Sequence, residues 1–188
     1  MTAVNRLTLG IVGCGSIGAR HARNAKALGV EHLLIADKDF ERARALASEL
    51  GCMAEGIAYG TSTGRCYADG AGAVMVATPA HTHAVVAKEL QTNGYRGPLF
   101  VEKPLAASVD ECAVFTAWPN IIQVGYNWRF NQDVLAFIAA HPLDRLAWGY
   151  LRCDTDIRRW PGANYGAPLL ECSHEIDLLY VVAPISVT

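Results

Sequence analysis

The sequence has no apolar run long enough to span a lipid bilayer. Its longest apolar stretches, such as residues 71–80 and 178–185, fall well short of the about 20 residues that a membrane helix needs. Net charge is also small, because 16 basic and 18 acidic side chains give −2, so neither nucleic acid nor a membrane surface is an expected partner. No basic and then apolar leader precedes the glycines that begin at Gly13, so an intracellular, cytoplasmic protein is expected.

Paired cysteine motifs are missing as well. None of the six cysteines forms a C-x-x-C pair, so neither a zinc site nor a redox dithiol is expected, and no metal ligands are predicted. We expect these cysteines to be reduced and mostly buried, where they behave as small apolar side chains. What the chain does have is apolar material: 52% hydrophobic against 18% charged residues can bury a core, which excludes wholesale disorder.

Short apolar runs alternate with longer amphipathic segments up to about residue 124. Strands are predicted over residues 7–12, 33–36, 73–77, 99–102 and 121–124. Helices are predicted over residues 17–28, 40–50, 84–91 and 109–116, and the glycine-rich stretch 55–72 is predicted to be a loop with one helical turn at most. This alternation is typical of an α/β fold, a Rossmann-type doubly wound parallel sheet with helices on both faces.

From about residue 125 the composition changes, and aromatic residues become frequent. Helices are predicted over residues 133–140 and 169–182, and a long strand over 146–154. A single strand leaves its backbone groups unpaired, so this second unit must pair with another segment or be incomplete. We therefore predict two domains, residues 1–124 and a truncated α+β domain over residues 125–188.

Residues 13–18 read Gly-Cys-Gly-Ser-Ile-Gly, a G-x-G-x-x-G directly after a predicted strand and at the start of a predicted helix. In this context Gly13 permits a tight turn, Gly15 lets the backbone approach a pyrophosphate, and Gly18 lets the helix pack closely on the sheet. The helix start, which includes Ser16 and Ile17, offers unpaired N–H groups and the positive end of the helix dipole to phosphates. The pattern predicts a dinucleotide-binding turn.

Asp37 stands at the end of the next predicted strand, about 20 residues further on, where such folds bind the adenosine ribose. Its carboxylate can accept hydrogen bonds from both ribose hydroxyls, and its charge would repel a 2′-phosphate. NAD is therefore the predicted cofactor, with NADP as the alternative because Lys38 is adjacent. A methyltransferase also places an acidic residue after its second strand, but the motifs that follow weigh against that class.

Three further motifs follow later predicted strands, where loops leave the carboxyl ends of a parallel sheet and bind ligands. They are Thr78-Pro79-x-x-x-His83, Glu102-Lys103-Pro104 and Asn127-x-Arg129-Phe130. Together with the glycine motif, this ordered set resembles the Gfo/Idh/MocA oxidoreductase family, which includes glucose–fructose oxidoreductase and inositol dehydrogenase. The resemblance covers nearly the whole chain.

The resemblance implies roles for the residues of these motifs. Lys103 would reach substrate and cofactor, Glu102 would pack near the nicotinamide, and the peptide bond before Pro104 would be cis. The residues expected to border the cofactor are Thr78, Pro79 and His83, and those expected to contact substrate are Asn127, Arg129 and Trp160. The alternatives are that His83 only caps or packs, that Asn127 and Arg129 form a structural bridge, and that Trp160 belongs to the core.

The family's acid/base histidine stands in a pattern like D-x-x-x-H-x-x-D on a helix, which this chain matches at His174 and Asp177. Leu170 replaces the first aspartate, and Glu171 follows it. Residues three or four apart share a helix face, so Glu171 and Asp177 are both expected within reach of His174. A carboxylate there could orient the imidazole and keep it basic. The alternative is a helix histidine satisfied by its neighbours or by solvent.

The implied activity is hydride transfer between a nicotinamide cofactor and a polyol, sugar or sugar derivative. His174 would take the hydroxyl proton, and Lys103 would stabilise the developing alkoxide. The resemblance also implies that residues 125–188 form part of a domain for substrate binding and homo-oligomerisation. Since family members are longer, three possibilities stay open: an enzyme that completes its site by self-association, a truncated NAD-binding product without turnover, and a non-catalytic sensing module.

Overall fold

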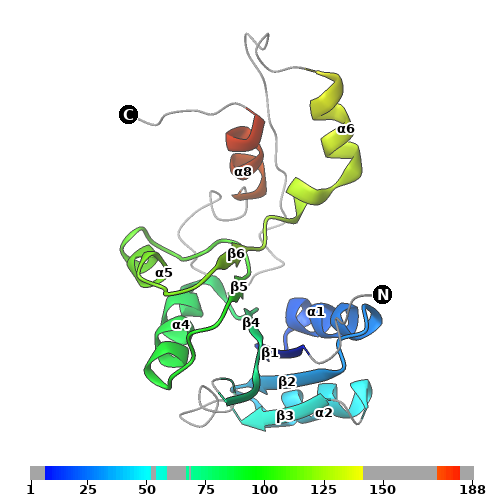
Figure 1. The fold of residues 1–188 in the computed structure, drawn as a ribbon, viewed down its shortest axis with the longest axis vertical. Helices are drawn as coiled ribbons and strands as arrows, with labels where there is room; N and C mark the ends of the chain where they lie inside the picture. The colour runs from blue at the N-terminus through cyan, green and yellow to red at the C-terminus, as the bar shows by residue number, and fades with distance from the viewer. Residues whose placement is uncertain (1–6, 52–53, 59–66, 68, 142–172, 183–188) are drawn as a thin grey trace, which may run out of the picture. The chain divides into compact units, whose positions relative to one another are not determined.

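The computed structural model describes residues 7–51, 54–58, 67, 69–141 and 173–182 (Figure 1). The chain divides into two compact units, Met1–Val124 and Gly125–Thr188, and each is described by itself. In the part of the chain so described, no helix has both the length and the apolar character that crossing a bilayer requires.

The first unit is built on one parallel sheet. Its strands are β1 (Thr8–Val12), β2 (His32–Asp37), β3 (Ala54–Ala58), β4 (Ala73–Val76), β5 (Leu99–Val101) and β6 (Ile122–Val124). The strand order is β3-β2-β1-β4-β5-β6, and every neighbouring pair is parallel. This is the Rossmann order, in which the chain returns to the middle of the sheet between β3 and β4 and so makes β1 and β4 neighbours.

Helices cover both faces of this sheet, as the predicted doubly wound fold requires. They are α1 (Ser16–Ala27), α2 (Phe40–Leu50), α4 (His83–Thr92), the 3₁₀ turn η2 (Asp110–Cys112) and α5 (Ala113–Thr116). One core cluster joins α1 and α2 to the sheet through Ala22, Ala43, Leu46, Ile11 and Ile35. The other joins α4 and α5 to the opposite face through Ala87, Leu90, Phe115, Val74 and Val101. The α/β prediction is confirmed for this unit, with strand and helix ends within a few residues of those expected.

Four strands end in step at one edge of the sheet. Val12 pairs with both Ala36 and Val76, and Val76 pairs with Val101. The loops that leave this edge therefore begin side by side although they are far apart in sequence. They carry residues 13–18, 37–39, 77–83 and 102–104.

The predicted loop over residues 55–72 is wrong for its first part, because Ala54–Ala58 form strand β3. This segment pairs in parallel with β2, from Leu33 opposite Ala54 to Asp37 opposite Ala58. Alanine, glutamate and glycine, which have low strand propensity, make up four of the five residues, and only Ile57 favours a strand, so the local signal is weak. The strand forms because the outer side of β2 offers a row of backbone donors and acceptors. Beyond it, residues 67, 69 and 70 are helical.

In the second unit the structure describes the 3₁₀ turn η3 (Asn127–Phe130), α6 (Gln132–Ala140) and α8 (Ser173–Val182). The Asn131 side chain caps α6, because its Oδ1 accepts hydrogen bonds from the N–H groups of Asp133 and Val134 at 2.9 and 3.1 Å. The helix predicted over residues 133–140 is confirmed, as is the 173–182 part of the helix predicted over 169–182. The predicted strand over residues 146–154 and the helix start at 169–172 lie outside the described residues.

Candidate functional site

The glycine turn after β1 leaves no room for side chains at its first and last glycines. Gly13 has a φ of +99°, and a Cβ on it would lie 2.7 Å from the carbonyl oxygen of Ala77. A Cβ on Gly18 would lie only 1.8 Å from the carbonyl oxygen of Gly13, so the first turn of α1 rests directly on the loop. Both contacts are with backbone atoms, which cannot move aside as a flexible side chain can.

Gly15 is different, because no described atom lies within 4 Å of the position its Cβ would take. It is the N-cap of α1, and the first turn of that helix contains no acidic residue. The exposed side chains of Ser16 and Ile17 follow it. An accessible helix N-terminus with a glycine at its start is a binding place for phosphate, since the first amides lack intrahelical acceptors and the dipole favours anions. The turn therefore fits the diphosphate of a dinucleotide.

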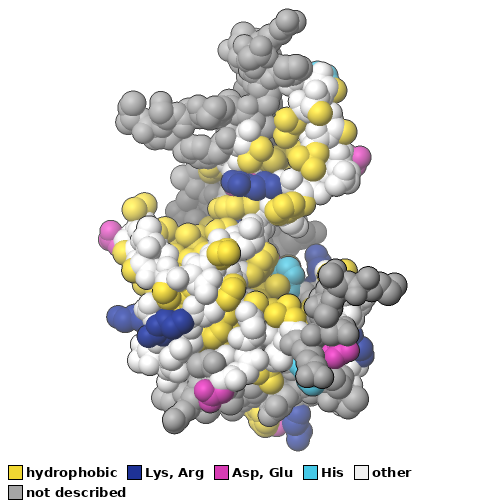
Figure 2. Space-filling view, in the orientation of Figure 1, with side chains coloured by type: hydrophobic (Ala, Val, Ile, Leu, Met, Phe, Trp, Pro, Cys, Tyr) yellow, Lys and Arg dark blue, Asp and Glu magenta, His cyan; other side chains and the backbone are white. Residues whose placement is uncertain are grey.

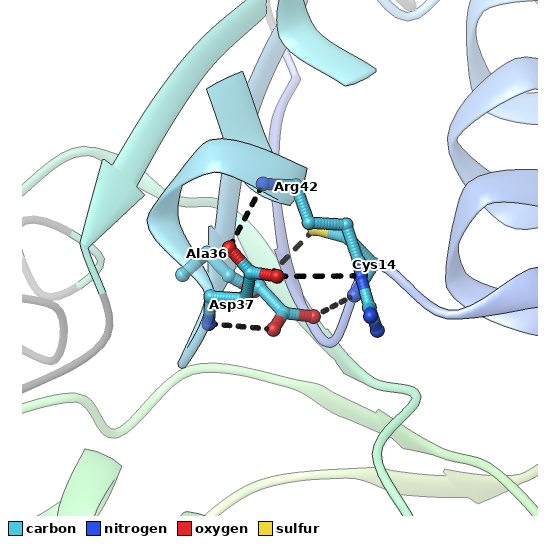
Figure 3. Close-up of polar contacts among 5 residues, drawn as sticks. Cys14, Ala36, Asp37 and Arg42 are labelled. Atoms are coloured by element: carbon cyan, nitrogen blue, oxygen red, sulfur yellow. Dashed lines mark hydrogen bonds and ion pairs between the residues drawn. The ribbon is translucent and has the colours of Figure 1, made fainter. Parts of the chain in front are cut away.

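Asp37 is fixed beside this turn by backbone hydrogen bonds (Figure 3). Its Oδ2 accepts a hydrogen bond from the N–H of Cys14 at 2.6 Å, and its Oδ1 accepts one from the N–H of Asp39 at 2.9 Å. The side chain is largely buried, with 7% of the residue exposed. A carboxylate has about four lone-pair sites, so each oxygen retains acceptor capacity for a ribose hydroxyl.

The Cys14 thiol is buried at the centre of the same turn. Burial and, after it, the nearby Asp37 carboxylate raise the pKa of Cys14 to about 12, so the thiol is neutral at physiological pH. Its Sγ lies 3.7 Å from the carbonyl oxygen of Ala36. Cys14 and the half-buried Cys112 are both free thiols.

Arg42, on the first turn of α2, is drawn beside the glycine turn in Figure 3, and its partner is the Asp39 carboxylate. Its guanidinium Nε lies 4.0 Å from Oδ2 of Asp39, and more than half of its side chain is exposed. Lys38, which suggested NADP as the alternative cofactor, is exposed next to Asp37. The carboxylate of Asp37 is thus held by backbone amides, and the cationic Lys38 and Arg42 follow it in the chain.

The Glu102-Lys103-Pro104 segment leaves the same edge of the sheet. The N–H of Glu102 donates to the carbonyl oxygen of Val76 at 2.9 Å and so continues the ladder between β4 and β5. The Lys103–Pro104 peptide bond is cis, which confirms what the family resemblance implied. Oε1 of Glu102 lies 2.6 Å from Nε2 of His21, and its Oε2 accepts a hydrogen bond from the N–H of Lys103 at 3.1 Å.

The Glu102 carboxyl ionises more readily than usual. Burial raises the pKa of Glu102. The hydrogen bond from His21, the charge of His21 and the hydrogen bond from the Lys103 N–H together lower it by more, so the pKa of Glu102 lies below its ordinary value. Sequence reasoning missed His21. No local pattern marks a histidine inside the first helix of a Rossmann fold as the partner of a residue 81 positions away.

His83 is the first residue of α4 and is buried, with 1% of the residue exposed. Its Nε2 is 2.7 Å from the carbonyl oxygen of Thr78, and its Nδ1 is 3.0 Å from the carbonyl oxygen of Pro104. A neutral imidazole has one N–H and can donate to only one of these oxygens, whereas the doubly protonated ring donates to both. These contacts connect two loops and fit the packing alternative, while the expectation that His83 borders the cofactor stays a prediction. Thr78 is half-buried, with its hydroxyl 2.8 Å from that of Thr82, and Pro79 is exposed.

In the second unit, aromatic rings surround His174. Its imidazole is stacked on Trp128, with ring centroids 5.6 Å apart and planes inclined by 8°. Tyr126 makes an edge-to-face contact with the same imidazole at 6.0 Å and 79°. These contacts fix the plane of the ring. Sequence patterns do not predict these contacts, because the aromatic residues and the histidine come from distant segments.

Asp177 is paired with Arg129, and its predicted role in orienting His174 stays a prediction. Nε of Arg129 donates to Oδ2 of Asp177 at 2.7 Å, and Nη2 donates to Oδ1, so both carboxylate oxygens are held by one guanidinium. Asp177 is buried, and the ion pair raises the pKa of Arg129. This ion pair fits the bridging alternative for Arg129, and contact of Arg129 with substrate stays a prediction. Asn127 is exposed in η3, whereas Glu171 and Trp160 lie outside the described residues.

A nucleotide-binding Rossmann domain with a lysine-bearing motif at the ligand edge is what this geometry defines. The family model described as "oxidoreductase family, NAD-binding Rossmann fold" (GFO_IDH_MocA) matches residues 7–117, which is more than half of the chain. The chain belongs to this Gfo/Idh/MocA oxidoreductase family.

Among its relatives, inositol 2-dehydrogenase 1 of Saccharopolyspora erythraea is 33% identical over 131 residues, which cover 65% of this chain and 37% of the relative. Inositol 2-dehydrogenase of Rubrobacter xylanophilus is 33% identical over 138 residues, covering 70% and 38%. The crystal structure of GenD2 from gentamicin A biosynthesis, in complex with NAD, is similar with a TM-score of 0.71 and 25% identity, covering 95% of this chain and 54% of that one. The chain thus spans well under half of the length of these curated relatives.

Proposed function

We propose that the chain binds NAD and acts in hydride transfer between its nicotinamide and the CH–OH group of a polyol, sugar or sugar derivative. The observation that carries this proposal is the position of Asp37. The turn that fits a diphosphate holds its carboxylate through the Cys14 N–H, at the sheet edge where Lys103 leaves β5. The names of the two inositol 2-dehydrogenases and the NAD complex of GenD2 support the cofactor and the substrate class.

Each part of the site has a role in this proposal. Bound NAD supplies the hydride acceptor for alcohol oxidation. The amides of residues 13–18 hold the diphosphate, and Asp37 accepts hydrogen bonds from the adenosine ribose. Lys103 donates a hydrogen bond and positive charge to the substrate oxygen, where negative charge develops. His174, its ring plane fixed by Trp128, accepts the hydroxyl proton.

The proposal gives the two units different roles. We assign residues 1–124 to cofactor binding and residues 125–188 to a partial domain for substrate binding and oligomerisation. Asn127 is the described residue of this second domain proposed to contact substrate, while Arg129 holds the helix that carries His174 by way of Asp177. NADP remains the alternative cofactor, because Arg42 and Lys38 supply positive charge near Asp37.

Titration with NADH tests the proposal. We expect NADH fluorescence to report a Kd in the range of about 1 μM to 1 mM that is typical of such sites. Asp37→Ala removes a charged acceptor and should weaken NADH binding at least about tenfold, with a smaller loss for NADPH. Glu41→Ala, which removes an exposed carboxylate from the first turn of α2, is the matched control and should leave the Kd unchanged. Unchanged fluorescence on adding the native chain would refute the proposal.

A nucleotide-binding module without turnover is the second candidate. It is favoured by the family match, which covers residues 7–117 and so lies wholly within the first unit. Incubating the chain with NAD and a panel of polyols and sugars separates the two candidates. Growth of the reduced-nicotinamide absorbance establishes the enzyme, and NADH binding without such growth establishes the module.

We also propose that the chain self-associates through α6. Phe130, Leu135 and Phe137, on and just before this helix, are 67, 40 and 60% exposed, and Figure 2 shows hydrophobic side chains gathered over it. Light scattering should therefore give a mass above the 20.2 kDa of one chain. Phe137→Lys should lower that mass to one chain, whereas Val109→Lys, at an exposed position in the first unit, should leave it unchanged. A native mass of one chain would contradict this proposal.

A further inference from the structure

His21 joins the helix of the glycine turn to the lysine-bearing loop. It lies in α1, the helix that begins at Ser16, and its Nε2 is 2.6 Å from Oε1 of Glu102. The side chains of His21 and Glu102 are 25 and 18% exposed, so the contact is shielded from water but within reach of the ligand edge. The imidazole also meets Phe100 of β5 edge-to-face at 5.5 Å and 67°, which fixes its plane.

The hydrogen bond from His21 continues to the backbone of Lys103. Glu102 uses its second oxygen, Oε2, to accept the Lys103 N–H at 3.1 Å. The backbone of Glu102 is itself anchored, because its N–H donates to Val76 at 2.9 Å. The carboxylate therefore connects a side chain of α1 with the amide of the next residue, and that residue carries the amine assigned to the substrate oxygen.

The other end of the motif is held independently. His83 of α4 lies 3.0 Å from the carbonyl oxygen of Pro104, the residue after Lys103. Lys103 thus stands between two backbone anchors, one set by His21 through Glu102 and the other set by His83. Removing one anchor leaves the other in place, so a change at His21 should redirect the Lys103 backbone without unfolding the loop.

We propose that His21 is a positioning residue that, by holding Glu102, fixes the backbone from which Lys103 reaches the substrate. Its catalytic consequence rests on the proposed function, but the hydrogen-bonded link itself does not. Since α1 also begins at the turn assigned to the diphosphate, the link makes one rigid helix set both the cofactor position and the aim of the lysine. A displacement of about 1 Å at such a group is enough to cost about 100-fold in rate.

The link can be followed without any activity, through the Lys103 amide proton in an NMR pH titration. The charged groups that act on Glu102 are His21 from α1 and Lys103 on its own loop. In the native chain the amide should shift with a midpoint below that of an ordinary glutamate. In His21→Ala the imidazole no longer opposes the effect of burial, so the midpoint should rise. In His21→Gln, where an amide donor reaches the same oxygen, it should stay close to the native value.

Kinetics supply the second measurement. His21→Ala should lower kcat for the alcohol by about 10- to 100-fold while the Kd for NADH changes less than about threefold. His21→Gln should recover most of this loss. Asn24→Ala, at an exposed position on the same helix, is the matched control and should behave as the native chain.

The two proposals fail in different ways. If NADH does not bind, the proposed function falls, but the amide titration still decides whether His21 holds Glu102. If the Lys103 amide has the same midpoint in the native chain and in His21→Ala, the positioning role is overturned. It is likewise overturned if His21→Ala retains full kcat in a chain in which Lys103 replacement abolishes turnover.

Discussion

Replacing Lys103 with methionine, or His174 with alanine, is expected to lower kcat by at least about 100-fold while the Kd for NADH stays within about threefold. Methionine keeps the length and apolar stem of lysine but removes the charge and the donors that would face the substrate oxygen. Alanine at position 174 removes the proposed proton acceptor. Neither side chain is assigned to the diphosphate or to the ribose, so binding should survive where turnover does not.

Steady-state kinetics with a polyol substrate, alongside an NADH fluorescence titration of each variant, measure both quantities. Lys88→Met and His141→Ala are the matched controls, because both replace exposed side chains of the same type, on α4 and at the end of α6. Circular dichroism melting curves check that each variant is folded. Full activity in a folded Lys103→Met chain would remove Lys103 from the chemistry and leave a cofactor-binding protein.

Gly18→Ala is expected to lower the free energy of unfolding by about 3 kcal/mol or more, a large part of the total for a domain of this size. The added methyl group would stand 1.8 Å from the carbonyl oxygen of Gly13, and neither backbone segment can yield without moving the loop or the helix. Urea denaturation followed by circular dichroism measures the change. A stability equal to that of the native chain would show that α1 does not rest on the loop as described.

Gly15→Ala separates the folding role of these glycines from their binding role. Its methyl group would point into space where no described atom lies within 4 Å, and the φ of −65° suits any residue. Stability should therefore change by less than about 1 kcal/mol, since the poorer N-cap offsets the lower entropy of the unfolded chain. NADH binding should nevertheless weaken at least about tenfold, because the methyl group occupies the approach of the diphosphate.

Much of the first unit could be predicted from sequence because its signals are local. A window of a few residues is enough to predict three of its elements. These are the apolar strand β1, the strand β2 that ends at Asp37, and the amphipathic helix α2 between Asp39 and Gly51. Strand β3 cannot be predicted in this way, because alanine and glycine have low strand propensity. Pairing with β2 determines its conformation. The pairing of β3 with β2 is a tertiary contact, and a short window of sequence does not predict it.

The same contrast holds for the candidate site. The glycine motif and Asp37 follow neighbouring strands at the spacing of a dinucleotide-binding fold, so their place at one edge of the sheet could be predicted, although the Cys14–Asp37 hydrogen bond could not. The contact of His21 with Glu102 and the stacking of Trp128 on His174 depend instead on how distant segments pack. Helical spacing and the family pattern predict Asp177 beside His174, but neither predicts the ion pair that Arg129, from another segment, makes with it. A bidentate guanidinium competes well for a carboxylate, and spacing does not reveal its presence.

The state of the Cys14 sulfur has a consequence for the chain under oxidative stress. Peroxides and alkylating reagents attack thiolates, and a thiol with a pKa of about 12 supplies almost none near neutral pH. The sulfur is also buried next to the Ala36 carbonyl, so it is poorly accessible to such reagents. A thiol in the glycine turn could have been a point of inactivation, but burial first and the Asp37 carboxylate second keep this sulfur protonated and unreactive.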